Sequence, residues 1–399
     1  MITEFNIQNY KSIEDINIKL GRVNVFIGEN GCGKSNILES LVIASAAIED
    51  KLDNEFLTSR GVRVTRPEIM RSAFDLKNTE KPINFEFKNN NSIFKYSITN
   101  DNKPYSKWNK VSLNNNVNKD LEKLTNELAK KYIDEKNDLV KQIVLLSNIN
   151  NDKKKSDLEI VKDFLKNIID EIPKNFFNNF IIYSPENTSL RTFEKEGQIE
   201  PLGIYGEGLF KLLKYFASEE NENENINKIK SYLSFFGWFE DFMIPEKLFE
   251  GESYLKIKDK FIDKKIDFID QRSSNEGFLF ILFYISLFLS KKTPAFFAID
   301  NIESSLNPKL ATKLVKCISE LSKENNKQVI LTSHSPSILD GLDLNDNEQK
   351  LFLIYRNRTG KTCIKEIEKP KLIEGQEPVK LSEAFLRGYI GGLPKNFSL

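Results

Sequence analysis

Hydrophobic and polar residues alternate at the start of the chain, in a pattern that predicts β-strands. The alternation covers residues 2–7 and returns over residues 16–20, as expected for strands with one buried face. A mainly apolar run over residues 22–27 then leads directly into GENGCGKS, and the helix-forming segment NILESLVIASAAI follows from about Lys34. The order strand, glycine-rich turn and helix is the order that a phosphate-binding loop requires.

The pattern changes several times in the middle of the chain. Two alternating runs between residues 83 and 99 flank an Asn-rich turn, which predicts an antiparallel hairpin. Residues 118–172 are highly charged, with apolar residues at spacings of three and four; they fit a helical hairpin or two ordinary amphipathic helices packed on the core. A buried strand is expected over residues 179–183, and the acidic segment 218–227 is typical of a solvated surface loop.

The last third of the chain alternates between helix and strand patterns. Helices are predicted over residues 277–289 and 308–323, and strands at AFFAID (295–300), QVILTS (328–333) and LFLIYR (351–356). This alternation indicates a mainly parallel sheet covered by helices on both faces.

We therefore predict an α/β fold of the P-loop NTPase type, with a mixed or mainly parallel sheet flanked by helices and with an inserted helical region. The 399 residues suggest two or three folding units. Residues 1–115 and 271–399 would form the two lobes of one nucleotide-binding head. Residues 116–175 would form a helical hairpin insertion, and residues 176–270 a connecting segment with a variable helical region.

Composition narrows the class of protein. The chain is 40% hydrophobic and 29% charged, as in an ordinary globular protein. It lacks any run of about 18 apolar residues, so no membrane span is expected. Its three cysteines have no paired spacing, which predicts a reduced, cytoplasmic setting. The 58 basic residues balance the 58 acidic ones; this argues against general coating of a polyanion but leaves a local basic patch open.

The segment GENGCGKS, residues 28–35, has the spacing G-x4-G-K-S. Glycines allow positive φ, so the backbone N–H groups can close around phosphate oxygens, and the helix N-terminus adds its dipole. Lys34 is predicted to bridge the β- and γ-phosphates of ATP, and Ser35 to bind Mg²⁺. The other expected nucleotide-binding residues of this segment are Asn30, Gly31, Cys32, Gly33 and Asn36.

Two later strands end in polar residues that fit the same site. Asp300 closes the apolar run AFFAI and is the second expected Mg²⁺ ligand. It lies far from Lys34 in the sequence, so a large insertion must split the nucleotide-binding domain. His334 is the only histidine and follows the next strand. A lone histidine is usually structural, but its place at a strand end predicts contact with the γ-phosphate or the attacking water.

Together these motifs resemble the ABC-type ATPases that are not transporters, which include chromosome-maintenance and break-repair ATPases and the OLD-like ATPases of bacterial defence. The opening NYKSIEDINIKLGRVNVFIGENGCGKSNIL is similar to the first segment of that group, SLNP (305–308) to its D-loop, and LTSHSP to its switch-histidine loop. The family's signature motif caps ATP bound to the opposite subunit. Its counterpart here is SSNEG (273–277), which implies contacts from Ser274 and Gly277; a plain helix N-cap is the alternative.

One departure from the family follows Asp300. The family usually has a glutamate there, the expected general base for water, whereas this chain has Asn301, with Ile302 in place of the usual proline. An amide cannot accept a proton at neutral pH. Glu303 is the candidate substitute. We therefore predict tight ATP binding with slow hydrolysis, in which Asn301, Glu303 and His334 are the candidate catalytic residues.

Two groups of basic and polar residues each have two interpretations. Lys11 and Ser12 lie where the family places a contact near the phosphates or the base, or they form a surface turn. Arg60, Arg63 and Arg66 follow the P-loop helix; they could meet a nucleic acid or a partner, or belong to a solvated loop.

The resemblance implies three possible functions. In the first, ATP closes a homodimer or higher oligomer that holds or releases a companion effector, such as a nuclease, in antiphage defence. In the second, the protein clamps DNA in repair or chromosome maintenance. The third, the ATPase subunit of a transporter, is the weakest, because the insertion is unusually placed and the signature is not the standard one. The balanced charge slightly favours the first over the second.

Overall fold

The computed structural model describes residues 1–89, 93–113, 177–192, 199–218, 222–245, 254–266, 268–368 and 379–391. The predicted helical insertion, residues 116–175, lies outside these ranges.

A six-stranded sheet forms the centre of the head, in the order β14-β13-β3-β12-β11-β7. Its strands are β3 (Val23–Ile27), β7 (Ile182–Tyr183), β11 (Phe296–Ile299), β12 (Gln328–Ser333), β13 (Gln349–Arg356) and β14 (Thr362–Ile367). All neighbours pair in parallel except β13 and β14. The predicted mixed, mainly parallel sheet is therefore confirmed, with β3 from the start of the chain lying between strands from its end.

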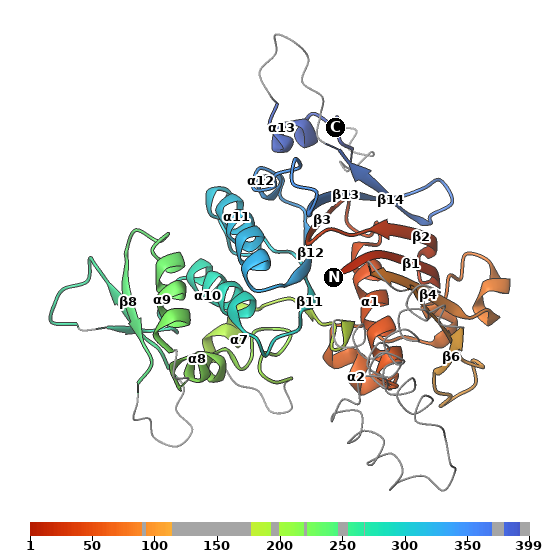
Figure 1. Cartoon of the computed structure of the whole chain (residues 1–399), viewed down its shortest axis with the longest axis horizontal. Coiled ribbons are helices and arrows are strands. Elements are labelled where there is room, and N and C mark those ends of the chain that lie inside the picture. The colour runs from red at the N-terminus through yellow and green to blue at the C-terminus, as the bar shows by residue number, and fades with distance from the viewer. Residues whose placement is uncertain are drawn as a thin grey trace, which may run out of the picture.

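Helices cover both faces of this sheet, because its strands are apolar on both sides. On β3, Val23 and Val25 belong to one hydrophobic core with α10 (Glu276–Leu289) and α11 (Pro308–Glu324), whereas Phe26 belongs to a second core with α1 (Lys34–Ile48). Figure 1 shows α10 and α11 on one side of the sheet and α1 on the other. Strands buried on both faces explain the continuous apolar runs in the sequence.

A second, antiparallel sheet shares the core around α1, in the order β2-β1-β4-β5-β6. Its strands are β1 (Ile2–Tyr10), β2 (Ile13–Lys19), β4 (Ile83–Asn89), β5 (Ile93–Thr99) and β6 (Asn109–Leu113). The register of β4 and β5 pairs Phe85 with Tyr96, so the hairpin predicted between residues 83 and 99 is confirmed. The short helices α2 (Asn54–Ser59), α3 (Pro67–Met70) and η1 (Leu76–Glu80) connect α1 to β4.

The segment between β7 and α10 holds a third sheet that the sequence did not predict. It is antiparallel in the order β10-β9-β8 and comprises β8 (Phe239–Met243), β9 (Lys256–Asp259) and β10 (Ile269–Asp270). The helices α7 (Asn187–Thr192), α8 (Leu209–Ser218) and α9 (Glu222–Leu233) lie in the same segment.

The surface loop predicted over residues 218–227 is wrong, because α9 begins at Glu222. Ile229 and Leu233, four residues apart, are fully buried on one side of this helix, and Ile226 packs against the same core. The prediction failed because the segment is rich in Asn and Glu, and most of the apolar residues with helical spacing follow after it in the sequence. The helices that end the described chain are α12 (Pro336–Leu339) and α13 (Leu381–Leu386).

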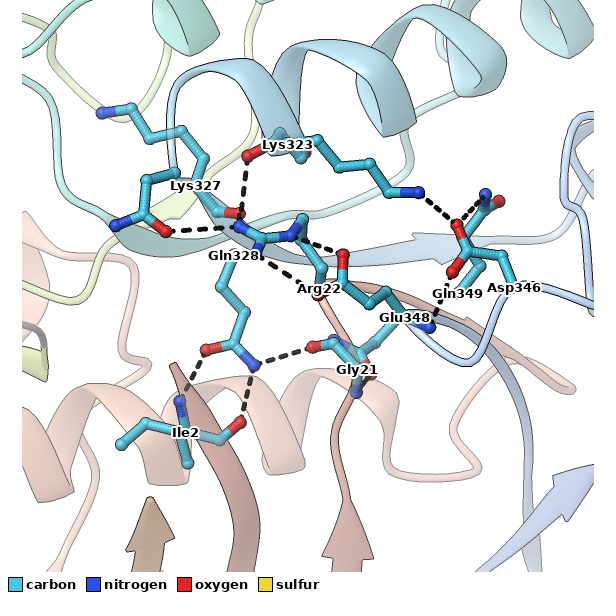
Figure 2. Close-up of polar contacts among 12 residues, drawn as sticks. Ile2, Gly21, Arg22, Lys323, Lys327, Gln328, Asp346, Glu348 and Gln349 are labelled. Carbon is cyan, nitrogen blue, oxygen red and sulfur yellow. Dashed lines mark hydrogen bonds and ion pairs between the residues drawn. The ribbon is translucent and has the colours of Figure 1, made fainter. Parts of the chain in front are cut away.

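A buried glutamine ties the N-terminal strand to the six-stranded sheet. Gln328, at the start of β12, accepts a hydrogen bond from the Ile2 N–H at 3.0 Å and donates to the carbonyls of Ile2 and Gly21, both at 2.7 Å. Figure 2 shows this amide close to Arg22, whose guanidinium donates to Glu348 at 2.8 Å. These contacts hold the amino ends of β1, β3 and β12 in register.

Replacing this glutamine should destabilise the fold. We expect Gln328→Leu to lower the free energy of unfolding by about 3 kcal/mol, because buried backbone groups of Ile2 and Gly21 lose a partner that water cannot replace. Lys323→Ala removes only a half-exposed ion pair with Asp346 from the same network and should change it by less than about 1 kcal/mol. Chemical denaturation measures both variants; equally small losses would contradict this role of the amide.

Candidate functional site

The glycine-rich turn between β3 and α1 is shaped for close contact with a ligand. Gly33 has φ of 110°, and a Cβ there would lie 2.1 Å from the Thr362 hydroxyl oxygen. A Cβ on Gly28 would lie 2.1 Å from the carbonyl oxygen of Ile354. Only glycine fits at these two positions. The turn therefore packs directly against β13 and β14, in a conformation that can bind an anion at the start of α1.

Lys34 lies folded over this turn. Its Nζ donates to the carbonyls of Gly28 at 2.8 Å and Glu29 at 3.1 Å. Burial lowers the pKa of Lys34, and the charges of Cys32, Asp300 and Glu303 oppose that shift. A buried ammonium held mainly by neutral carbonyls is prepared to exchange them for phosphate oxygens.

The residues predicted from the P-loop, except Cys32, meet Asp300, Asn301 and His334 in one pocket of about 380 Å³ at the carboxyl edge of the central sheet. Because β3, β11 and β12 run parallel, the turn after each strand reaches the same edge. The pocket is lined by Asn30, Gly31, Gly33, Lys34, Ser35, Asn36, Arg63, Asp300, Asn301, His334 and Arg356. Cys32 is buried beneath the turn instead.

These residues fit MgATP. The Ser35 hydroxyl and the Asp300 carboxylate share the pocket, and Mg²⁺ is commonly held by one or two carboxylates together with substrate phosphates. Within the described ranges, no group of three or more His, Cys, Asp or Glu side chains could hold a metal ion. The Ser35 and Asp300 oxygens suit a cation that binds together with the phosphates of a nucleotide.

The backbone after β11 is held by β12. The Thr332 hydroxyl donates to Asp300 and accepts from the Asn301 N–H at 2.9 Å. Asn301 has φ of 54°, in the left-handed region that asparagine tolerates better than most residues. Asn301 is one of the residues that line the pocket, in the position where the resemblance places a glutamate.

Glu303 lies under the switch-histidine loop. One of its carboxylate oxygens accepts the backbone N–H of His334 at 2.7 Å, and the other is buried without a partner among the described residues. Glu303 does not line the pocket described above. Its geometry supports the position of His334, while Asn301 is the residue that faces the nucleotide pocket.

His334 lines the pocket, and its side chain is exposed to solvent. Burial lowers its pKa, and the positive charge of Lys34 lowers it further, against the opposing charges of Glu303 and Asp300. The lowered pKa favours the uncharged imidazole at neutral pH, which can donate one hydrogen bond and accept another. This state suits contact with a phosphate oxygen or an attacking water.

A polar cluster behind the turn joins it to β14. The Thr362 hydroxyl donates to the carbonyl of Cys32 at 2.9 Å and lies 2.6 Å from the Ser12 hydroxyl, which in turn accepts from Asn36 Nδ2 at 2.6 Å. Ser12 is therefore a buried support of the phosphate-binding turn, and the surface-turn interpretation is wrong for it.

Thr362→Val should weaken ATP binding about tenfold, because it removes the hydrogen bond that holds the Cys32 carbonyl and one of the two contacts of the Ser12 hydroxyl. Thr359→Val is the matched control, since Thr359 lies in the same hairpin, is exposed and bonds only to Asn357. Isothermal titration with MgATP measures both. Equal affinities would show that β14 does not position the turn.

A second cluster, around a buried glutamate, places a guanidinium at the pocket. The Glu39 carboxylate is buried and pairs with Lys11 and with Arg63 Nε, the latter at 2.5 Å. Arg63 Nη2 donates to Asn36 Oδ1 at 3.3 Å, and its side chain lines the pocket. Arg63 is mostly exposed, as the solvated-loop interpretation expects, but its guanidinium is tied to Glu39 and lies at the pocket. Lys11 is likewise tied to Glu39 rather than standing in a free surface turn.

The other two arginines of the predicted basic cluster point elsewhere. Arg60 is buried against the Phe56 ring, and Arg66 is exposed at the start of α3. The three side chains do not form one basic surface.

The signature turn lies apart from the pocket of its own chain. Asn275, not Ser274, caps α10 through a 2.9 Å hydrogen bond from the Phe278 N–H. The Ser274 hydroxyl is buried without a partner among the described residues. Ser273 is exposed, and Glu276 accepts a hydrogen bond at 2.8 Å from the hydroxyl of Ser305, in the D-loop segment. Ser274 and Gly277 do not line the nucleotide pocket.

Three residues around the site were not assigned to it from the sequence. Arg356 ends β13 and lines the pocket; its place at the end of a predicted strand was the available signal. Arg63 was noticed without a link to the nucleotide. Thr362 had no signal, because its contact with the turn depends on the pairing of β13 with β14.

Comparisons with known proteins agree with this description. Residues 23–340 match the family described as "AAA domain, putative AbiEii toxin, Type IV TA system". The DNA replication and repair protein RecF of Bacillus cytotoxicus is 36% identical over 55 residues, which cover 14% of this chain and 15% of that protein. RecF of Alkaliphilus oremlandii is 43% identical over 47 residues, covering 12% and 13%. The chain thus spans only a small part of the length of these curated relatives.

The fold is similar to that of a solved SMC head. The structure titled "SmcHead bound to the C-winged helix domain of ScpA" is similar with a TM-score of 0.52 and 15% identity, covering 92% of this chain and 98% of that chain. The predicted ABC-ATPase-like head is therefore confirmed. Among the described residues, none of the helices has the length and apolar character that a membrane crossing requires.

Proposed function

Because the chain belongs to the AAA domain family that its residues 23–340 match, we propose that it binds MgATP and acts as an ATP-operated switch between two copies of itself. One observation carries the proposal. Lys34, Ser35, Asp300 and His334 converge in one pocket, while Ser274 and Gly277 lie outside it. The pocket is thus one part of a site that a second chain would complete.

Each residue of the pocket has a distinct task in holding MgATP. Lys34 contacts the β- and γ-phosphates, and the backbone of residues 30–33 surrounds their oxygens. Ser35 and Asp300 hold Mg²⁺, which neutralises charge on the phosphates when bound. Arg63 and Arg356 add two guanidinium groups at the pocket wall.

The signature turn supplies the contact from the second chain. Because the Ser274 hydroxyl is buried, we place the polar contact on the exposed side of this turn, at Ser273, and on the free N–H groups at the start of α10, including Gly277. The hydrogen bond from Ser305 to Glu276 links the turn to the D-loop segment, so both would respond together when a partner docks.

Closure of two heads would control a companion protein. The family description names a putative toxin of a type IV toxin–antitoxin system, which supports a function exercised with a partner, such as a nuclease effector in antiphage defence. All three cysteines are free, which supports the expected cytoplasmic location.

A second candidate function is DNA clamping in repair or chromosome maintenance. Two observations favour it: the stretches of identity with RecF and the shared fold of the SMC head. A titration with duplex DNA at several salt concentrations, with and without ATP, separates the two functions. ATP-dependent binding that weakens steeply with salt would favour the clamp.

Mixing two inactive variants tests the composite site. Lys34→Ala loses the nucleotide pocket but keeps the signature turn, whereas Gly277→Glu keeps the pocket and places a carboxylate where the partner's phosphates would lie. Each should hydrolyse no ATP alone, and the mixture should recover hydrolysis, because a mixed pair contains one complete site. A mixture that stays inactive while both variants remain folded would reject the shared site.

A further inference from the structure

A second cavity, larger than the nucleotide pocket, lies at the opposite edge of the central sheet. Its volume is about 580 Å³, within the range of small-molecule sites. Ala295 and Lys327, directly before β11 and β12, and Ile181, directly before β7, line it. It therefore sits at the amino ends of the strands whose carboxyl ends carry Asp300 and His334.

The wall of this cavity contains a buried arginine without a counter-ion. Arg60 is 9% exposed, and it pairs with no carboxylate of the described residues at ion-pair distance. Its two terminal nitrogens donate only to neutral oxygens, those of Phe56, Ser59 and Asn179, at 3.2 to 3.5 Å. Its Nε is buried with no partner at all in the described structure. The guanidinium also lies 3.4 Å from the centroid of the Phe56 ring, which offsets part of the cost of burying its charge, and an anion would offset more of it.

The other large buried arginine shows what a satisfied guanidinium looks like in this fold. Arg71 uses all three of its nitrogens, including Nε, which donates to the Lys81 carbonyl at 2.7 Å. Burial lowers the pKa of Arg60 and of Arg71 alike. The Nε of Arg60 therefore has no hydrogen-bond partner in the described structure, whereas that of Arg71 has one. Arg60 is also one of the residues that line the cavity.

The remaining charges around the cavity are mostly positive. Lys291 and Lys292 line it from the loop before β11 and are exposed. Lys327 lines it too, but its ammonium already donates to the carbonyls of Thr293 and Pro294. Glu200 is the one acidic residue of the lining, and it pairs with Lys211 at 3.2 Å.

Asn178 provides a buried hydrogen-bond acceptor that, like the Nε donor of Arg60, lacks a partner in the described structure. This acceptor is Oδ1, and Asn178 lines the same cavity. Glu49, the carboxylate whose charge acts most strongly on Arg60, is engaged by the Asn179 N–H at 2.7 Å and by Lys51. A ligand that satisfies this site needs an anionic group for Arg60 and the two exposed lysines.

We propose that this cavity binds a phosphate monoester of sugar-phosphate or nucleotide size, with its phosphate on Arg60, Lys291 and Lys292. Arginine recognises phosphate through its N–H donors, and the terminal nitrogens of Arg60 can exchange their long hydrogen bonds to neutral oxygens for phosphate oxygens. The site is separate from the P-loop and does not depend on the function proposed for it. The ester can be a free metabolite or the 5′-phosphate end of a nucleic acid, which share this chemistry.

Calorimetric titration of the full chain with ribose 5-phosphate tests the proposal, with ribose as the blank. Binding should persist in Lys34→Ala, which removes the competing phosphate site. It should weaken at least tenfold in Arg60→Met and in the double variant Lys291→Ser, Lys292→Ser, but not in Arg66→Ala, an exposed arginine nearby. Binding that is lost in Lys34→Ala and kept in Arg60→Met would overturn the proposal, as would no binding at all.

Two further measurements complete the test: the thermal stability of Arg60→Met and the binding of oligonucleotides. Arg60→Met should stay folded, as thermal melting can check, because it keeps an apolar stem of similar length while removing the buried charge, three long hydrogen bonds and a ring contact; should it fail to fold, the lysine double variant decides. Oligonucleotides with a 5′-phosphate or a 5′-hydroxyl identify the source of the ester. Tighter binding of the phosphorylated strand through Arg60 assigns nucleic-acid ends, and binding of ribose 5-phosphate alone assigns a metabolite. Arg60-independent binding of both strands, with no binding of ribose 5-phosphate, contradicts the site.

Discussion

Lys34→Ala is expected to reduce ATP affinity at least a hundredfold and to bring ATP hydrolysis below detection. The Nζ of Lys34 is the buried cation over the glycine turn, and its two carbonyl partners, Gly28 and Glu29, hold it where phosphates would arrive. A charge-assisted contact of this kind, lost from a site with few other cations, costs about 3 kcal/mol. Binding of a fluorescent ATP analogue and release of phosphate measure the two effects.

Lys51→Ala provides the control for this change. Lys51 is exposed just beyond the other end of the same helix and pairs with Glu49. It should leave both quantities unchanged. A Lys34→Ala protein that binds ATP as tightly as its parent would place the nucleotide elsewhere and remove the basis of the proposed switch.

Asn301→Glu is expected to raise the turnover of ATP about a hundredfold or more. Asn301 lines the pocket beside Asp300, but its amide cannot take a proton from water, and a positioned general base typically contributes about 10²–10⁴-fold. Single-turnover hydrolysis of radiolabelled ATP measures the change. The backbone strain of a glutamate at φ of 54° would reduce stability modestly without removing the base.

Asn301→Gln is the control for side-chain length, because glutamine is as long as glutamate but cannot accept a proton from water. It should stay as slow as the parent. Glu303→Gln tests whether Glu303 is the base instead. Glu303 accepts a hydrogen bond from the backbone N–H of His334. If hydrolysis is fast in the parent and is abolished by Glu303→Gln, then Glu303 is the base and Asn301 is not the reason for slow turnover.

The nucleotide site could be predicted from the sequence because its determinants are local. Strand, turn and helix around Lys34 are contiguous, and Asp300 and His334 each follow directly on an apolar strand. In a parallel sheet the carboxyl ends of such strands meet at one edge. Knowing the strands was therefore enough to bring the three residues together.

The rest of the site depends on pairings that no local pattern encodes. Thr362 reaches the glycine turn only because β14 pairs with β13 and β13 with β3. Arg63 reaches it only because the buried Glu39 holds its guanidinium. Likewise, the Gln328 bridge joins residues more than three hundred positions apart. The three-stranded sheet β10-β9-β8 was missed because its strands are short, and β10 has only two residues.

The central claim is that MgATP joins two copies of the chain through the pocket of one and the signature turn of the other. Light scattering after size exclusion, with a slowly hydrolysed ATP analogue and Mg²⁺, tests it most directly. The particle mass should double relative to the nucleotide-free protein, and the doubling should disappear in both Lys34→Ala and Gly277→Glu. A mass that is the same with and without nucleotide would contradict the account.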